Sequence, residues 1–62
     1  MNVLLAGAAG FVGRVALELL NERHQVTAFD IQNVEFNGAI VGDVLDYAAV
    51  ITAMQGIDAV VN

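Results

Sequence analysis

Three glycines, Gly7, Gly10 and Gly13, lie between an apolar segment and a segment with helical periodicity. A helix that begins just after Gly10 would present unpaired N–H groups and the positive end of its dipole at this junction. Gly7 would allow a tight turn after a strand, and Gly10 would leave room for a ligand to approach the backbone. Gly13 would let the first helical turn lie against the strand. The spacing therefore predicts a site for a diphosphate group.

Two acids follow later apolar segments. Asp30 closes the second expected strand, and an ionised carboxylate there can accept hydrogen bonds from both ribose hydroxyls of an adenosine. Asp43 follows the third expected strand, where a role in supporting the next turn stays open beside a role in binding. Together with the glycines, Asp30 predicts a dinucleotide site. The alternative interpretations are a glycine-rich turn without a ligand and a solvated acid at a strand end.

The expected elements that position these residues alternate along the chain. A continuous apolar run at 2–6 is typical of a buried parallel strand, and further strands are expected at 25–30, 39–41 and 58–62. A second helix is expected from Asp46, as its N-cap, to about residue 55, whereas 31–38 reads as an open loop. This pattern predicts an α/β fold, the N-terminal part of a doubly wound parallel sheet with strand order 3-2-1-4.

The first expected helix spans residues 11–23. Its apolar stripe is predicted to contain Val12, Val15, Ala16, Leu19 and Leu20, with Leu17 outside it. Arg23 and His24 lie where a helix C-terminus favours positive charge, which is the interpretation we prefer for His24.

Composition excludes several classes of function. The 62 residues carry a net charge of −5 with two arginines and no lysine, which argues against a nucleic-acid surface. There is no cysteine, hence no disulfide or thiolate metal site, and no metal-ligand cluster is seen. No apolar stretch reaches the roughly 18 residues of a membrane span, and the start does not read as a signal peptide. We therefore expect a cytoplasmic protein.

The share of apolar residues bears on domain organisation. At 58% it exceeds the usual apolar content of about 45–50%. We expect residues 1–62 to be the N-terminal part of a larger dinucleotide-binding Rossmann domain, whose remainder is absent. We also expect that the isolated chain is not a stable monomer.

The glycine motif resembles the N-terminus of the extended short-chain dehydrogenase/reductase family, the NAD-dependent epimerases and dehydratases. There the sequence typically reads Thr-Gly-x-x-Gly-Phe-Ile/Val-Gly, against Ala6-Gly7-x-x-Gly10-Phe11-Val12-Gly13 here. The resemblance continues at Asp30, at Gly42-Asp43 and over residues 56–62. It departs at Ala6, where the family usually has Thr, and at Arg23-His24, where Gly-His is common.

This resemblance implies a cofactor-binding segment that holds the adenosine and pyrophosphate of NAD. The cofactor-binding residues that we predict are Gly7, Gly10, Phe11, Val12, Gly13, Asp30, Ile31, Asp43 and Val44. The resemblance implies that Asp43 binds the adenine amino group and that Val44 offers an apolar wall. NADP is disfavoured because no basic residue follows Asp30, although Arg14 could reach a phosphate.

No catalytic constellation is present. Tyr47 is a poor candidate because the family needs Tyr-x-x-x-Lys and residue 51 is Ile51, so we expect Tyr47 to pack at the start of the second helix. The resemblance implies an epimerase, dehydratase or reductase with catalytic residues downstream and a small-molecule substrate, of which a nucleotide sugar is one candidate. The alternatives are an atypical NAD(P)-binding sensor of the same fold and a structural fragment. A downstream Tyr-x-x-x-Lys would separate the enzyme from the sensor.

Overall fold

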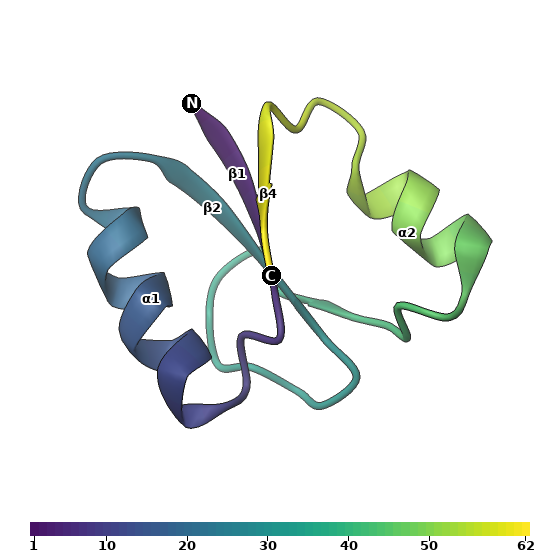
Figure 1. Cartoon of the computed structure of the whole chain (residues 1–62), viewed down its shortest axis with the longest axis horizontal. Coiled ribbons are helices and arrows are strands. Elements are labelled where there is room, and N and C mark those ends of the chain that lie inside the picture. Colours follow the sequence, from purple (N-terminus) through teal and green to yellow (C-terminus); the bar gives the residue numbers. More distant parts are fainter.

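The computed structural model describes all 62 residues, which form one parallel sheet with a helix on each face. The elements are β1 (Asn2–Ala6), α1 (Phe11–Asn21), β2 (Gln25–Asp30), β3 (Ile40–Val41), α2 (Tyr47–Ala53) and β4 (Ala59–Val61). The strand order is β3-β2-β1-β4, and all pairings are parallel. Figure 1 shows α1 and α2 on opposite sides of the sheet. The predicted α/β class and strand order are confirmed.

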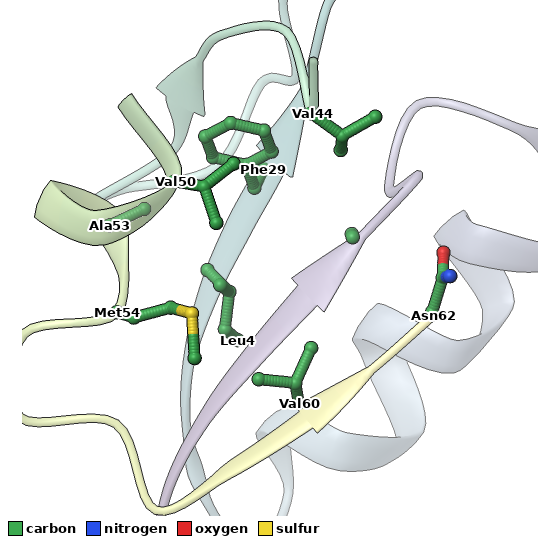
Figure 2. A pocket seen from close by; sticks show the side chains of 9 residues that line it. Leu4, Phe29, Val44, Val50, Ala53, Met54, Val60 and Asn62 are labelled. Atoms are coloured by element: carbon green, nitrogen blue, oxygen red, sulfur yellow. The ribbon is translucent and has the colours of Figure 1, made fainter. Parts of the chain in front are cut away.

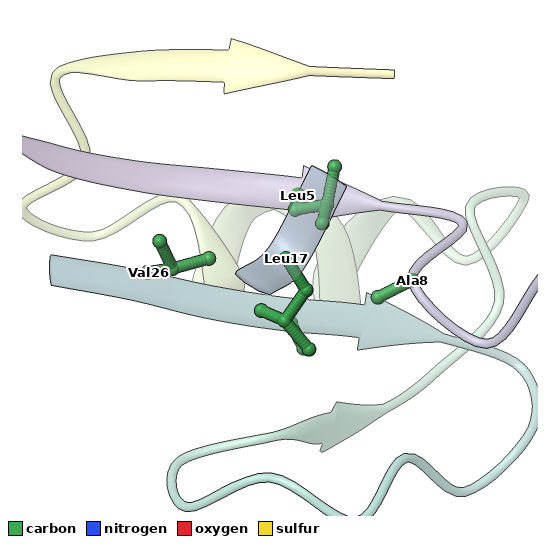
Figure 3. Close-up of a cluster of buried hydrophobic side chains, with 5 residues drawn as sticks. Leu5, Ala8, Leu17 and Val26 are labelled. Carbon is green, nitrogen blue, oxygen red and sulfur yellow. The ribbon is translucent and has the colours of Figure 1, made fainter. Parts of the chain in front are cut away.

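Side chains of β1 and β2 alternate between two buried clusters, as strand geometry requires. On the α1 face, Leu5 packs with Ala8, Leu17, Val26 and Ala28 (Figure 3). On the α2 face, a smaller cluster contains Leu4, Phe29 and Ala53. Neither helix is long and apolar enough to cross a membrane.

The bounds of the first two strands agree with the prediction, and the other elements are shorter than expected. Helix α1 ends at Asn21 rather than residue 23, and α2 ends at Ala53 rather than about residue 55. The third and fourth strands are shorter at their ends, spanning Ile40–Val41 and Ala59–Val61. Element ends are set by a few hydrogen bonds, which apolar periodicity does not specify.

The predicted apolar stripe of α1 is only partly confirmed, because Ala16 and Leu20 pack against the buried cluster but other positions differ. Leu17, which we placed outside it, is buried at 7% exposure, whereas Val12 and Leu19 are 78% and 63% exposed. The reason lies at Gly13, because a Cβ there would overlap the carbonyl oxygen of Gly7 and lie 2.9 Å from Cα of Ala8. This contact turns the face with residues 13, 16, 17 and 20 toward the sheet.

The connection from β2 to β3 is an open loop, as predicted. Val34 and Phe36 from this loop pack against the cluster on the α1 face. The loop therefore covers part of the sheet with two side chains, where a longer crossover would use a helix.

Helix α2 begins at the predicted residue, but Tyr47 does not pack there as expected. Asp46 is its N-cap, and its carboxylate accepts a hydrogen bond from the N–H of Ala49 at 3.2 Å. Tyr47 is 77% exposed, so the expectation that it packs at the start of α2 is wrong. The buried position of this helix is Ala53.

We expect Gly13→Ala to destabilise the full-length protein by about 1–3 kcal/mol, because the new methyl group meets backbone atoms that cannot rotate away. The matched control is Gly10→Ala, whose Cβ would lie 3.7 Å from the Gly7 carbonyl oxygen, an ordinary contact. Urea unfolding of both variants measures the difference. Equal midpoints would show that the close packing of Gly13 does not limit stability.

Candidate functional site

The site lies where the parallel strands end and α1 begins. The carboxyl ends of β1, β2 and β3 point to one edge of the sheet, and the strand order reverses between β1 and β4, where ligands commonly bind in such sheets. Gly10 is the N-cap of α1 and provides no side-chain cap. The first N–H groups of the helix, on Phe11, Val12 and Gly13, therefore have no acceptor within it.

The glycine turn is built from backbone contacts. Gly7 has φ +81°, a conformation that favours glycine, and its N–H donates to the Phe29 carbonyl oxygen at 2.9 Å. Gly10 has φ −73° and ψ 169°, which any residue adopts, and a Cβ there would meet only the Gly7 oxygen, at 3.7 Å. Neither the backbone angles nor the packing requires glycine at position 10. The absence of a side chain there leaves open space beside the N-terminus of α1.

Asp30 has a structural role that the sequence did not reveal. One carboxylate oxygen accepts a hydrogen bond from the Ala9 N–H and the other from the Gln32 N–H, each at 2.9 Å. The hydrogen bond from Gln32, followed by that from Ala9, lowers the pKa of Asp30 below its ordinary value. The carboxylate is therefore ionised at neutral pH, and each oxygen keeps a lone pair for a further donor.

A hollow of about 260 Å³ at this edge brings together five of the nine predicted site residues. They are Gly7, Asp30, Ile31, Asp43 and Val44, and the remaining lining residues are Ala6, Phe29, Gly42 and Asn62. Val12 and Gly13 line an adjacent hollow of about 270 Å³ on the α1 side, which also includes Gly7. Gly10 and Phe11 line neither hollow, and Phe11 is exposed at the start of α1.

Asp43 supports its own turn, as one of the two open interpretations expected. Its side chain accepts a hydrogen bond from the Leu45 N–H at 2.9 Å, and its carbonyl oxygen accepts one from the Asp46 N–H at 2.9 Å. Because Asp43 also lines the hollow with Asp30, the turn role does not exclude contact with a ligand.

Sequence reasoning missed Asn62, which lines both hollows at the site and the apolar cavity beside α2. Figure 2 shows its side chain beyond the end of β4. A signal was present, because Asn62 is the polar residue that directly follows the apolar strand β4.

Comparisons with known proteins agree with this geometry. Residues 3–62 match the model of the NAD dependent epimerase/dehydratase family. A 2-alkyl-3-oxoalkanoate reductase of Stenotrophomonas maltophilia (strain K279a) is 41% identical to this chain in an alignment 66 residues long. The alignment covers 97% of this chain and 20% of the reductase.

A solved structure is also similar. It is a short-chain dehydrogenase/reductase superfamily protein from Agrobacterium tumefaciens with bound NAD, which is 32% identical with a TM-score of 0.86. The match covers 97% of this chain and 19% of that protein. The chain thus spans about a fifth of the length of both relatives.

We expect the contribution of Asp30 to stability to depend on pH. Because its folded-state pKa is lowered, the contribution is present above the ordinary carboxyl pKa of about 4 and is lost as the pH falls through the folded-state value. Thermal melts of the full-length protein between about pH 2 and pH 6 test this, with Asp30→Asn expected to flatten the profile. Glu22→Gln, at an exposed position, is the control that removes one negative charge elsewhere on the chain. An Asp30→Asn profile that follows the wild type would contradict the assignment.

Proposed function

The chain belongs to the NAD-dependent epimerase/dehydratase family, and we propose that residues 1–62 are the first part of a dinucleotide-binding domain that holds the adenosine and pyrophosphate of NAD. The observation that carries this proposal is Gly10. It is not required by the fold, yet it leaves space at the uncapped start of α1, on the sheet edge that also carries Asp30. An anionic group fits this place because it would accept from the free N–H groups and would lie at the positive end of the helix dipole.

Each part of the cofactor has a proposed partner. The pyrophosphate lies against the N–H groups of the first turn of α1, with Gly7, Gly10 and Gly13 shaping the backbone around it. The ribose hydroxyls donate to the lone pairs of Asp30 that Ala9 and Gln32 leave free.

The adenine ring is placed at the far side of the hollow. Asp43 accepts from its amino group, while Ile31 and Val44 give apolar contact. Both apolar side chains are more than half exposed, which leaves them free to be covered by the ring.

Bound NAD supplies hydride transfer, and we propose that the full-length protein is an oxidoreductase of this kind. The chain does not itself contain the Tyr-x-x-x-Lys of the family, because the fourth residue after Tyr47 is Ile51 and not a lysine. Whether the reaction is epimerisation, dehydration or reduction, and whether the substrate is a nucleotide sugar, depends on residues beyond Asn62. We also propose that the full-length protein is cytoplasmic. A full-length protein without the Tyr-x-x-x-Lys pair would instead favour an NAD-binding sensor.

We expect Gly10→Val to abolish NAD binding by the full-length protein while leaving its melting temperature near that of Gly10→Ala. The Val side chain occupies the open space that the pyrophosphate needs, but its Cβ clashes with nothing inside the chain. Calorimetric titration with NAD, together with a thermal melt, tests this. Unchanged affinity in a folded variant would mean that the glycine turn does not hold the pyrophosphate.

We also expect the full-length protein to bind NAD more tightly than NADP. The 2′-phosphate of NADP would bring a second anion against the Asp30 carboxylate, and Ile31, Gln32 and Asn33 offer no cation to offset it. Asp30→Ala should weaken NAD binding by about tenfold or more and reduce the discrimination against NADP.

The measurement is the dissociation constant of each cofactor for the wild type, Asp30→Ala and Arg14→Gln. Arg14 is included because it is the nearby cation that could favour a phosphate. A wild type that binds NADP at least as well as NAD would show that the assignment of Asp30 is wrong.

A further inference from the structure

Gly42 precedes the proposed adenine-binding Asp43, and its backbone does not explain why it is a glycine. Its φ lies outside the left-handed region, unlike that of Gly7. What the position lacks is space. A Cβ on Gly42 would lie 2.9 Å from Cζ of the Phe29 ring, closer than real Cβ atoms pack. It would also lie 3.0 Å from Cε2 of the ring, which is a tight contact, and 3.7 Å from Cβ of Ala49.

The Phe29 ring is buried, and it also lines the apolar cavity of about 230 Å³ beside α2. It is 2% exposed and packs with Leu4 and Ala53, with Val50 beside them. Figure 2 shows the Val50 side chain of α2 overlapping the ring in this view, with Val44 to the right of the ring. Its backbone is fixed as well, because its carbonyl oxygen accepts the hydrogen bond from the Gly7 N–H at 2.9 Å. Phe29 therefore connects the glycine turn to the floor of the hollow that Asp30 and Asp43 line.

The segment at Gly42 is held from the other side by the sheet. The Gly42 N–H donates to the carbonyl oxygen of Asp30 at 2.9 Å, which places Asp43 one residue beyond a backbone tie to Asp30. A side chain at position 42 would have to displace either the buried ring or this segment. Because the ring is buried whereas Gly42 and Asp43 are only half-buried, the segment is the part that yields.

We propose that Gly42 and Phe29 form a positioning pair for the adenosine end of the site. Direct contact between the Gly42 backbone and the Phe29 ring sets the separation of Asp43 and Val44 from Asp30. This inference rests on the proposed function, since it assigns how two residues of the same site are placed. Neither Gly42 nor Phe29 need touch the cofactor for this role.

A double-mutant cycle in the full-length protein tests the pair, with NAD affinity measured by calorimetry. Gly42→Ala should raise the Kd for NAD by about tenfold. Phe29→Leu removes the Cε and Cζ atoms that the new methyl group would meet. In that background, adding Gly42→Ala should raise Kd by about threefold or less, so the two changes are strongly non-additive. A role in stability alone would alter the melting temperature without this compensation in Kd.

The outcomes are distinguishable. A wild type that binds no NAD overturns the proposed function and the inference with it. A wild type that binds NAD, with additive effects of the two changes on Kd, overturns the inference alone. If Gly42→Ala by itself fails to fold, folded and NAD-binding protein from the double variant supports the inference. Failure of the double variant where Phe29→Leu folds overturns it.

Discussion

The packing of α1 on the end of β1 depends on the absence of a side chain at Gly13. With no Cβ, the first turn of the helix lies directly against the carbonyl oxygen of Gly7 and Cα of Ala8. This contact fixes both the rotation of α1 about its axis and the position of its N-terminus. The rotation determines that Leu17 enters the core, and the position places the free N–H groups at the edge where β1 and β2 end. Packing and the proposed anion site thus follow from one steric constraint.

A second constraint is electrostatic and is provided by Asp30. Its carboxylate holds the backbone of the glycine turn through Ala9 and the start of the next loop through Gln32. Hydrogen bonds from backbone N–H groups to a carboxylate are stronger than those to a neutral acceptor, and they favour the ionised form. The carboxylate that would accept hydrogen bonds from the ribose hydroxyls therefore also orders the two loops that would flank the ribose. The proposed binding residue is held in place before a ligand arrives.

The sequence predicted what depends on local composition and missed what depends on contacts across the fold. Continuous apolar runs identified β1 and β2 with their bounds, and Asp46 was recognised as an N-cap because its function is local. The buried face of α1 was mistaken because Val12 and Leu19 are as apolar as Leu17, and only the contact of Gly13 with Gly7 distinguishes the faces. The hydrogen bonds of Asp30 escaped prediction for the same reason.

The glycines near the site differ in what requires them, and the difference bears on function. Gly7 is explained by its backbone angle, and Gly13 and Gly42 are explained by atoms of the chain that a Cβ would meet. These three would be favoured in this fold even if it bound nothing. Gly10 has neither explanation, because its angles suit any residue and its surroundings are open. A residue such as Ser or Asp would even stabilise the helix as an N-cap there, so its absence costs the free protein some stability. A glycine that the fold does not need, at a helix start that the fold leaves uncapped, is what the proposed pyrophosphate site would explain, because an anion there would accept from the free N–H groups.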